Sequence, residues 1–421
     1  MDPDDPVFDD PRPYGLPRGM DMFQEWVGNE FQLYFEYDPS KGFVSFGDTH
    51  NRVEIGKTVD WFIVNKDPGI GPLIDRLSDR DWSDAEVSKL LDQIHGDLAA
   101  NALFLALKEP WRHPFNRLNF DPEPSPSDAA PPVIRPQPRV WAELAFRYED
   151  VRHDGNAHGF RISRPGIAVG VDRRLSSHSV FGAAFQYANP RLRQDTGRVK
   201  ADDFEFGLYN LTRLPDDFEL KSYLGYSRQH YDFRRSVSLP AAPSGVYGAF
   251  YEQLNGSTNG QALAASVELT RPIQLRRDIR LLPVAAFDFE KAWMRGFRES
   301  AGLASLTYGN ASLERTMLRF GLNAEFELRN GLSLRSSLQY ARRVNGQSYP
   351  SIGARFANGG PGQPTADIWG SRIGRNALNL GLSGGWKFGR DGDRRIYLNY
   401  EAKLFNRATI QSGEIGFVKV W

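Results

Sequence analysis

The chain has 421 residues and no cysteine. The absence of cysteine excludes a disulfide scaffold, a thiolate metal site and a cysteine nucleophile. The chain also has no net charge, because 52 Lys and Arg residues balance 52 Asp and Glu residues. A nucleic-acid-binding protein would show a basic excess, so we expect no nucleic acid among its partners. No run approaches about 18 consecutive apolar residues, so the sequence predicts no transmembrane helix.

Aromatic residues and glycine are abundant instead. Aromatics make up 13% of the chain, with 28 Phe, 16 Tyr and 9 Trp, and there are 40 glycines. The mean hydropathy of −0.49 is typical of a soluble protein, and such a length ordinarily corresponds to two or three domains. Composition alone does not account for the aromatic excess.

The first residues predict a disordered tail. Residues 1–29 are rich in Asp and Pro. Asp2, Asp4 and Asp5 lack the glycine and the distal glutamate of a calcium loop. The tail also lacks the basic start and the apolar run of a secretory signal.

A short strand-bearing segment is predicted over residues 30–82. Alternation over 31–46, around a turn at 38–42, predicts a hairpin, and 53–64 predicts a weaker strand. The sequence Gly69-Ile-Gly71 lacks the rest of a phosphate-binding loop, and Pro72 follows it. We therefore interpret this glycine pair as an ordinary loop.

The clearest helix signal begins at Ser83. Ser83 and Glu86 have the spacing of a capping box, in which each side chain bonds a free backbone N–H of the first turn. Apolar residues then recur at helical spacing until Pro110 ends the pattern, which predicts a helix over 84–109 within a segment 83–120. Polar residues on its other faces exclude a lipid environment. The apolar positions are Val87, Leu91, Ile94, Leu98, Ala102 and Leu105.

A linker separates this segment from the rest of the chain. Residues 121–138 hold seven prolines among Asp, Glu, Ser and Ala, a composition typical of an extended linker and a domain boundary. From 139 to 421 the chain breaks into about twelve segments, many of which alternate polar and apolar residues. In the segment 318–329, for example, one face carries Leu318, Phe320, Leu322, Ala324, Phe326 and Leu328, and the other carries Arg319, Asn323, Glu325 and Glu327.

Two architectures use such a pattern. A soluble β-sandwich buries the apolar face and keeps its strands short. A transmembrane barrel turns the apolar face to lipid and the polar face to a lumen, with longer strands, short turns at one end and long loops at the other. Here turns at 175–178, 214–217, 329–331 and 390–393 are short, and loops at 236–258 and 346–375 are long. The pattern favours the barrel and leaves the sandwich open.

Several runs also resemble a known family. The runs Trp141-Ala-Glu-Leu, Gly166-Ile-Ala-Val-Gly-Val-Asp-Arg-Arg-Leu175 and Val180-Phe-Gly-Ala-Ala-Phe-Gln-Tyr187 resemble the first strands of the autotransporter β-domain. The runs 203–209, 220–226, 296–300 and 353–356 continue the resemblance. It implies that 139–421 is one all-β transmembrane barrel of about twelve antiparallel strands, which belongs to type V secretion.

The resemblance extends to the helix. Leu90-Leu-Asp-Gln-Ile-His-Gly-Asp-Leu-Ala-Ala100 is similar to the family's segment before the barrel, where a helix threads the pore. This implies a pore helix whose polar residues face lumen water, and lumen-lining positions Arg319, Asn323, Glu325 and Glu327 that contact it. The segment 30–82 resembles the end of a passenger domain. The pore-helix residues are Leu91, Ile94, His95, Asp97 and Asn101.

The C-terminal strand resembles the signal that the outer-membrane insertion machinery reads. The chain ends in Trp421, with Phe417 and Ile415 on the same face. The family more often ends in Phe with an aromatic residue two places earlier, where this chain has Lys419. A lysine at that position can extend its ammonium group to the headgroups.

No catalytic or cofactor site is predicted. There is no His-Glu-x-x-His pair and no Gly-x-Ser-x-Gly elbow. His230 and Asp232 would share one strand face and Ser227 would lie on the other, which argues against a triad. Asn101 is a candidate for self-cleavage in the pore by position only. We therefore expect neither an enzyme nor a bound metal or cofactor.

The sequence thus predicts the outer-membrane translocator of a Gram-negative autotransporter, which exports or anchors an N-terminal passenger at the cell surface. Expected partners are outer-membrane lipids and lipopolysaccharide, the barrel insertion machinery, periplasmic chaperones and the chain's own passenger segment. About 80 residues precede the helix, which suggests a truncated or mis-started frame, or a piece of a longer protein. The alternatives are a plugged porin-like structural barrel without secretion and, less favoured, a barrel hydrolase.

Overall fold

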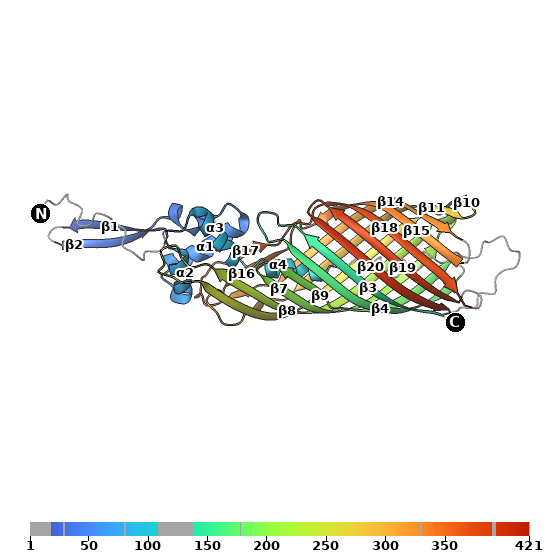
Figure 1. Ribbon diagram of the computed structural model, residues 1–421, viewed down its shortest axis with the longest axis horizontal. Helices are drawn as coiled ribbons and strands as arrows, with labels where there is room; N and C mark the ends of the chain where they lie inside the picture. The colour runs from blue at the N-terminus through green and yellow to red at the C-terminus, as the bar shows by residue number, and fades with distance from the viewer. Residues whose placement is uncertain are drawn as a thin grey trace.

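The alternating segments form a closed barrel in the computed structural model, which describes residues 18–27, 30–79, 81–107, 138–176, 178–328, 331–389 and 393–420. Within these residues, twelve antiparallel strands make the barrel wall (Figure 1). They are β3 (Pro138–Val151), β4 (Phe160–Ser176), β5 (Ser179–Ala188), β7 (Gly197–Arg213), β8 (Glu219–Leu239), β9 (Phe250–Thr270), β11 (Ile279–Met294), β14 (Ala311–Glu327), β15 (Leu332–Gly346), β18 (Asn376–Phe388), β19 (Arg394–Phe405) and β20 (Ala408–Val420).

Closure is made by the pairing of the last strand with the first. β20 pairs antiparallel with β3, from Ala408 opposite Val151 to Val420 opposite Arg139, and β11 joins β9 to β14. Every wall strand therefore has a hydrogen-bonding neighbour on both sides. A bilayer core offers no water to a free backbone group, so closure is what lets a sheet stand in lipid.

Side-chain exposure shows that the barrel is inverted relative to a soluble protein. On β14, Phe320 and Leu322 face outward with 54% and 43% of their surface exposed, while Arg319 and Asn323 face inward with 1% and 0%. A β-sandwich would bury the apolar face, so this arrangement excludes the sandwich and confirms the barrel.

The two barrel ends differ as predicted. Short connections lie between β4 and β5, β7 and β8, β14 and β15, and β18 and β19, at the end where β3 begins and β20 ends. The loop predicted at 236–258 is wrong over most of its length, because β8 and β9 are 21 residues each and leave only 240–249 between them. Beyond the apolar band, the two strands continue as a hydrogen-bonded pair with alternating polar residues. Glu219–Leu239 and Phe250–Thr270 pair along their whole length.

The long connections carry small sheets. β12 (Phe297–Arg298), β13 (Leu306–Tyr308), β16 (Ser351–Phe356) and β17 (Ala366–Trp369) form a four-stranded sheet at the end opposite the short turns. β6 (Arg191–Gln194) extends β4 and β7, and β10 (Ile273–Arg276) pairs with β11. The 346–375 loop is thus long, as predicted, but is partly strand.

The N-terminal hairpin differs from its prediction. β1 (Met20–Val27) pairs with β2 (Glu30–Tyr37), from Met20 opposite Tyr37 to Val27 opposite Glu30, so the hairpin predicted around a turn at 38–42 is wrong and the disordered tail predicted for 1–29 is wrong over β1. The residues predicted as the return strand form 3-10 turns instead. These turns are η1 (Pro39–Lys41), which Asp38 caps by accepting from the Ser40 N–H, and η2 (Phe43–Phe46).

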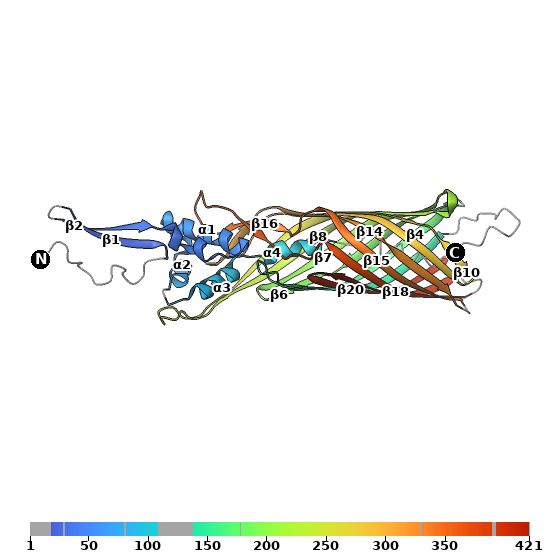
Figure 2. The ribbon, with the colours of Figure 1, turned by 90° about the horizontal axis from the view of Figure 1, so that it is seen from above.

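Helices stand between this hairpin and the barrel (Figures 1 and 2). They are α1 (His50–Val64), η3 (Pro68–Ile70), α2 (Gly71–Leu77), α3 (Asp84–Ile94), α4 (Leu98–Asn101) and η4 (Ala102–Leu105), with η5 (Pro215–Asp217) in a barrel turn. The strand predicted at 53–64 is wrong. Ile55, Val59 and Phe62 are buried at helical spacing in α1, so all three lie on one face of the helix. In a strand, alternate residues would point to two opposite faces.

The long pore helix predicted at 84–109 is also wrong. Its start is confirmed, because Ser83 and Glu86 make the capping box. The helix ends at Ile94, however, and Gly96 has a φ of +74°, a backbone conformation that interrupts a right-handed helix. Only α4 and η4 enter the barrel, while α1, α2 and α3 remain at its mouth. Residues 108–120 and the linker predicted at 121–138, except Pro138, lie outside the described residues.

The apolar core therefore lies at the mouth. Buried side chains of the helices, the four-stranded sheet and the upper strands form one cluster there, whereas the barrel below is filled by charged residues and by a smaller cluster around Trp141, Tyr209 and Tyr397. None of the helices in the described ranges has the length and apolarity to cross a membrane.

A charge on the outer wall tests the lipid-facing assignment. Leu398 on β19 is 61% exposed, and Leu398→Arg is expected to lower the free energy of unfolding by about 2–4 kcal/mol in bilayers, because the guanidinium would face hydrocarbon. Val246→Arg, at a 71% exposed site in the β8–β9 loop, is the control and should change it by less than about 0.5 kcal/mol. Denaturant titration in phospholipid vesicles measures both. Equal effects would contradict the assignment.

Candidate functional site at the plugged mouth of the barrel

Residues 98–107, which we call the plug, fill the barrel mouth. α4 and η4 lie against β6, β7, β11 and β14. Leu98, Leu103 and Leu105 are at most 1% exposed, and the ring of Phe104 lies 5.3 Å from that of Phe160 on β4. Burying such side chains stabilises the plug by about 1.5–3 kcal/mol each. The upper lumen is thus occupied by packed apolar residues rather than by water.

A sharp turn delivers the chain into the barrel. Gly96 separates α3 from α4, and a Cβ at this position would lie 2.5 Å from the Tyr308 hydroxyl and 2.6 Å from Leu306 Cδ1. The positive φ and this close approach both require glycine. The turn redirects the polar residues that follow it toward the barrel loops.

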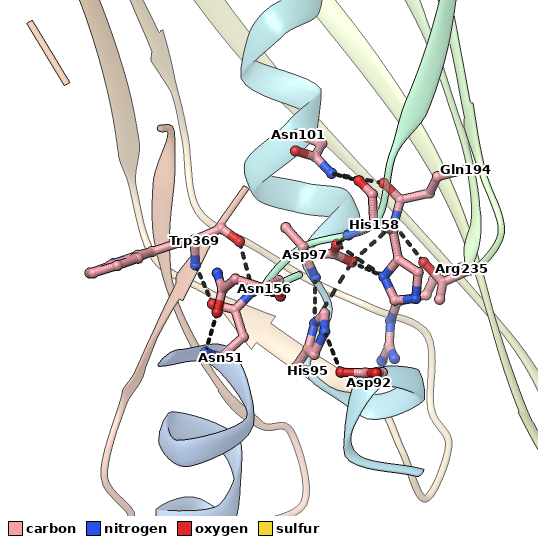
Figure 3. A network of polar contacts seen from close by, with 12 residues as sticks. Asn51, Asp92, His95, Asp97, Asn101, Asn156, His158, Gln194, Arg235 and Trp369 are labelled. Carbon is pink, nitrogen blue, oxygen red and sulfur yellow. Dashed lines mark hydrogen bonds and ion pairs between the residues drawn. The ribbon is translucent and has the colours of Figure 1, made fainter. Parts of the chain in front are cut away.

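Asp97 makes the central contact, which we call the latch (Figure 3). Its Oδ2 accepts a 2.7 Å hydrogen bond from the backbone N–H of His158, in the β3–β4 loop, and lies 3.1 Å from Nδ1 of the same ring. Its Oδ1 accepts from Gln194 Nε2 of β6 at 2.9 Å. Asp97 has 0% of its surface exposed. Because this buried carboxylate is paired and fully hydrogen-bonded, breaking the pair would be costly.

Asn101, one turn later, joins two loops to the plug. Its Oδ1 accepts from the Ser371 N–H at 2.8 Å, and its Nδ2 donates to Gln194 Oε1 at 3.0 Å. The Ser371 hydroxyl donates to the His158 carbonyl at 2.6 Å. Asn101 is fully buried, so the predicted exposure of Asp97 and Asn101 to lumen water is wrong. Protein partners satisfy both side chains.

The two partners of the latch have pKa values that are shifted in opposite directions. Burial by itself would lower the pKa of His158, but the hydrogen bond and charge of Asp97, with Asp92 and Asp195 nearby, raise this pKa above its ordinary 6.5. Burial alone would raise the pKa of Asp97, but His95 and His158 lower it to about 2. Burial and the neighbouring charge of His158 lower the pKa of His95. The raised pKa of His158 and the lowered pKa of Asp97 both favour a carboxylate–imidazolium pair.

The same residues form the cluster with metal-ligating character in the described part of the chain. His95, Asp97 and His158 offer ligand atoms within 4.8 Å of one another. The Asp97 oxygens already have three donors, and His95 Nδ1 lies 3.3 Å from the Asp97 N–H. This hydrogen-bonded arrangement needs no metal to be satisfied.

Further contacts hold α1 and the loops over the plug. Asn51 Nδ2 donates to the Trp369 carbonyl at 2.7 Å, and the Asn51 N–H donates to Asn156 Oδ1 at 2.8 Å. His50 stacks on Trp369 with ring centroids 3.5 Å apart. α1 thus ties the loop before β4 to β17.

Two arginines of the wall complete the mouth. Arg235 on β8 donates to both carboxylate oxygens of Glu299 at 2.8 and 2.7 Å, in a buried bidentate pair. Arg164 on β4 lies 3.4 and 3.3 Å from the carbonyls of Phe104 and Leu107 and satisfies the end of the helical turn. Neither arginine carried a sequence signal, because each acts on residues far away in the chain.

The predicted lumen residues lie deeper in the barrel. Arg319 donates to Asp288 at 2.6 Å and to Gln339 at 2.6 Å, and Asn323 accepts from Gln339 at 3.0 Å. Glu325, 7% exposed, accepts from Arg280 at 2.7 Å. These residues line the lumen, but among the described residues their hydrogen bonds go to other wall strands rather than to the pore helix.

The remaining predicted residues lie apart from this network. Glu327 shares a strand face with Asn323 and Glu325 but lies exposed at the end of β14 by the short turns, so its lumen-lining role stays a prediction. Leu91 and Ile94 are buried in the core at the mouth, outside the barrel wall. Ile415 and Phe417 face outward on β20 with 51% and 40% exposure. Trp421 lies outside the described residues.

The latch predicts a pH dependence of plug opening. Because the pKa of folded His158 is raised, its pairing is complete below pH 6.5 and is lost as the pH rises through the folded value. The Asp97 side of the pair is lost only as the pH falls toward about 2. Amide exchange of residues 98–107, corrected for the intrinsic rate, should be less protected at pH 9 than at pH 6.

Asp97→Asn should remove this pH dependence. It should also lower the local opening free energy by about 1.5–3 kcal/mol, because a charged hydrogen bond is lost. The wall amides around Leu322 serve as the internal reference. Equal protection of residues 98–107 at both pH values in the wild type would contradict the latch.

The barrel segment of this chain matches a known family. The model of the Autotransporter beta-domain family matches residues 140–401, which is more than half of the chain. No curated protein sequence matches significantly.

One solved autotransporter domain shares the fold, and two others match with lower scores. The translocator domain of the autotransporter NalP from Neisseria meningitidis matches with a TM-score of 0.54 and 14% identity, over 67% of this chain and 88% of that one. The transport unit of the autotransporter AIDA-I from Escherichia coli matches with a TM-score of 0.46 and 11% identity, over 78% and 98% of the two chains. The β-domain of the Bordetella autotransporter BrkA matches with a TM-score of 0.41 and 18% identity, over 67% and 99%.

The family match, the inverted twelve-strand barrel and the occupied mouth agree with one another. A barrel domain of this kind is a transport device that is non-catalytic in itself, and it resides in the outer membrane of Gram-negative bacteria. This chain belongs to the autotransporter β-domain family and is an outer-membrane translocator of type V secretion.

Proposed function

We propose that the structure represents the translocator after export, with the end of its passenger outside the cell and the plug closing the mouth. The observation that carries this proposal is the latch, in which Asp97 upstream of the barrel is buried against His158 and Gln194 of the barrel loops. A segment that only passes through a pore would not need a buried ion pair with its rim. The latch is suited to a terminal, closed state.

The orientation supports the same proposal. In bacterial barrels the short turns face the periplasm and the long loops face outward. The hairpin β1–β2 and helices α1 to α3 lie at the long-loop end, opposite the C-terminus (Figure 1). Residues 18–94 would therefore lie at the cell surface, as the end of a passenger does.

The chain would act by transport and anchoring rather than by catalysis. Ser227 is 2% exposed and bonds Gln229 inside the barrel. His230 and Asp232 face outward, with half or more of their side chains exposed. A nucleophile and a base on opposite sides of the wall cannot share a proton, so this set has no hydrolytic geometry.

The outward face of β20 supports a role in assembly. Ile415 and Phe417 project from the last strand toward lipid, where the insertion machinery could bind them. We propose this machinery, periplasmic chaperones, outer-membrane lipids and lipopolysaccharide, and the passenger segment as the partners. The lumen-lining role of Arg319, Asn323 and Glu325 would keep the barrel interior wet below the plug.

Conductance tests the closed state. The wild-type barrel in planar bilayers should remain mostly closed, and the double variant Asp97→Asn/Asn101→Ala should show frequent large openings, because the plug loses its polar contacts to three loops. Asp48→Asn changes an exposed aspartate of the same helical unit, with 73% side-chain exposure, and should conduct like the wild type. A double variant as closed as the wild type would overturn the proposed role of the latch.

Assembly in cells tests the C-terminal strand. Phe417→Ala should lower the amount of heat-modifiable barrel in outer-membrane fractions several-fold, because an outward aromatic of the insertion signal is lost. Tyr400→Ala removes an outward aromatic of similar exposure, 49%, from the adjacent strand β19, and should have little effect. Equal losses would mean that Phe417 contributes only lipid contact.

A further inference from the structure

Four arginines lie side by side on the outer wall, on β4, β6, β7 and β8. In the strand registers, Arg161 is opposite Arg193, Arg193 is opposite Arg198, and Arg198 is opposite Arg234. All four side chains are exposed. We call this set the arginine row. Like charges at directly opposite positions destabilise a sheet, so the row needs a compensating interaction.

Acidic neighbours do not neutralise the row. Arg161 is 3.4 Å from Asp150, but both are exposed and such a pair contributes little. Arg193, Arg198 and Arg234 have no ion-pair partner within the described part of the chain.

A second row adds to the excess of positive charge. Arg191 is opposite Lys200, and both are exposed. Asp232 is the acid beside Lys200 in the register, and its carboxylate is 3.7 Å from His230. The two rows together carry six cations on one face of the wall, against the carboxylates of Asp150, Asp202 and Asp232, with Asp195 in the turn between β6 and β7.

The height of the rows places them above the lipid band. On β7, the outward apolar residues begin at Phe204 and continue through Phe206 and Leu208, four residues beyond Lys200 and six beyond Arg198. At about 3.3 Å per residue and a tilt of about 40°, the cations stand roughly 10–15 Å outside the first lipid-facing ring. The headgroup region of an ordinary phospholipid leaflet is only about 5–8 Å deep. A phosphate that reaches the arginine row must therefore belong to a lipid with a taller headgroup.

We propose that the outer wall of β4, β6, β7 and β8 is a binding surface for the phosphates of lipopolysaccharide. Arginine binds phosphate through paired N–H donors, and neighbouring strands present these donors about 4.8 Å apart. One lipid that carries several phosphates can therefore bridge the row and relieve its self-repulsion. The inference rests on the outer-membrane location of the translocator and adds a ligand site to it. The two rows lie at the long-loop end of the barrel, so the lipids that can reach them are those of the outward leaflet.

The test uses the purified full-length protein and two double variants. Arg193→Ser/Arg198→Ser removes the centre of the row. Arg342→Ser/Arg375→Ser removes two exposed arginines at the same end of the opposite wall, at the paired ends of β15 and β18. The probes are lipopolysaccharide with phosphorylated inner core, the same lipid after enzymatic dephosphorylation, phosphatidylglycerol and inorganic phosphate. Binding is measured in detergent by native mass spectrometry and by titration at low and high salt.

The expected result is salt-sensitive binding of phosphorylated lipopolysaccharide that falls at least tenfold in the row variant and is unchanged in the control. The row variant should remain heat-modifiable and, without lipid, should unfold at the same or a higher temperature, because removing two arginines relieves repulsion. A lower melting temperature in lipid-free detergent would assign the row a structural role and overturn the proposal. Equal losses in both variants, or equal binding of the dephosphorylated lipid, phosphatidylglycerol or free phosphate, would also overturn it.

Discussion

Hydrogen bonding of the backbone in lipid is the constraint on which the structure depends. A sheet in a bilayer cannot leave an edge unpaired, and the pairing of β20 with β3 removes the last edge. Once the sheet is closed, every second residue must face lipid and the others must face inward. The apolar outer wall, the charged interior and the low mean hydropathy of −0.49 all follow from this one condition.

A polar interior creates the problem that the plug solves. A wide barrel lined with charged residues would leak unless a segment fills it. An apolar plug, however, makes few favourable contacts with a charged wall. The plug therefore packs its leucines on the apolar loops and upper strands at the mouth, and Asp97 and Asn101 accept hydrogen bonds from the backbone N–H groups of His158 and Ser371. Buried charges throughout the mouth are paired, as Arg235 with Glu299 is, because an unpaired charge in that position would be prohibitively costly.

The outer surface follows the same logic at its upper edge. Above the apolar band the wall strands continue as polar ladders, and their side chains meet whatever lies outside the hydrocarbon. On β4 to β8 that surface is cationic, which suits the phosphorylated face of the outer leaflet. The lumen, the mouth and the outer rim thus each match the medium that they contact.

Local patterns determined much of this protein. The alternation from 139 to 421 predicted the barrel and the direction of Leu318 to Leu328, and the Ser83–Glu86 spacing predicted the start of α3, because these signals act between residues close in the chain. The tertiary structure decided the rest. The broken helix at Gly96 depends on Tyr308 and Leu306, the helix at 50–64 depends on packing against η2, and the latch joins Asp97 to His158 and Gln194 across the closed sheet. No periodicity records which distant residues meet, so sequence identified Asp97 and Asn101 as pore-helix residues but could not identify the partners that bury them.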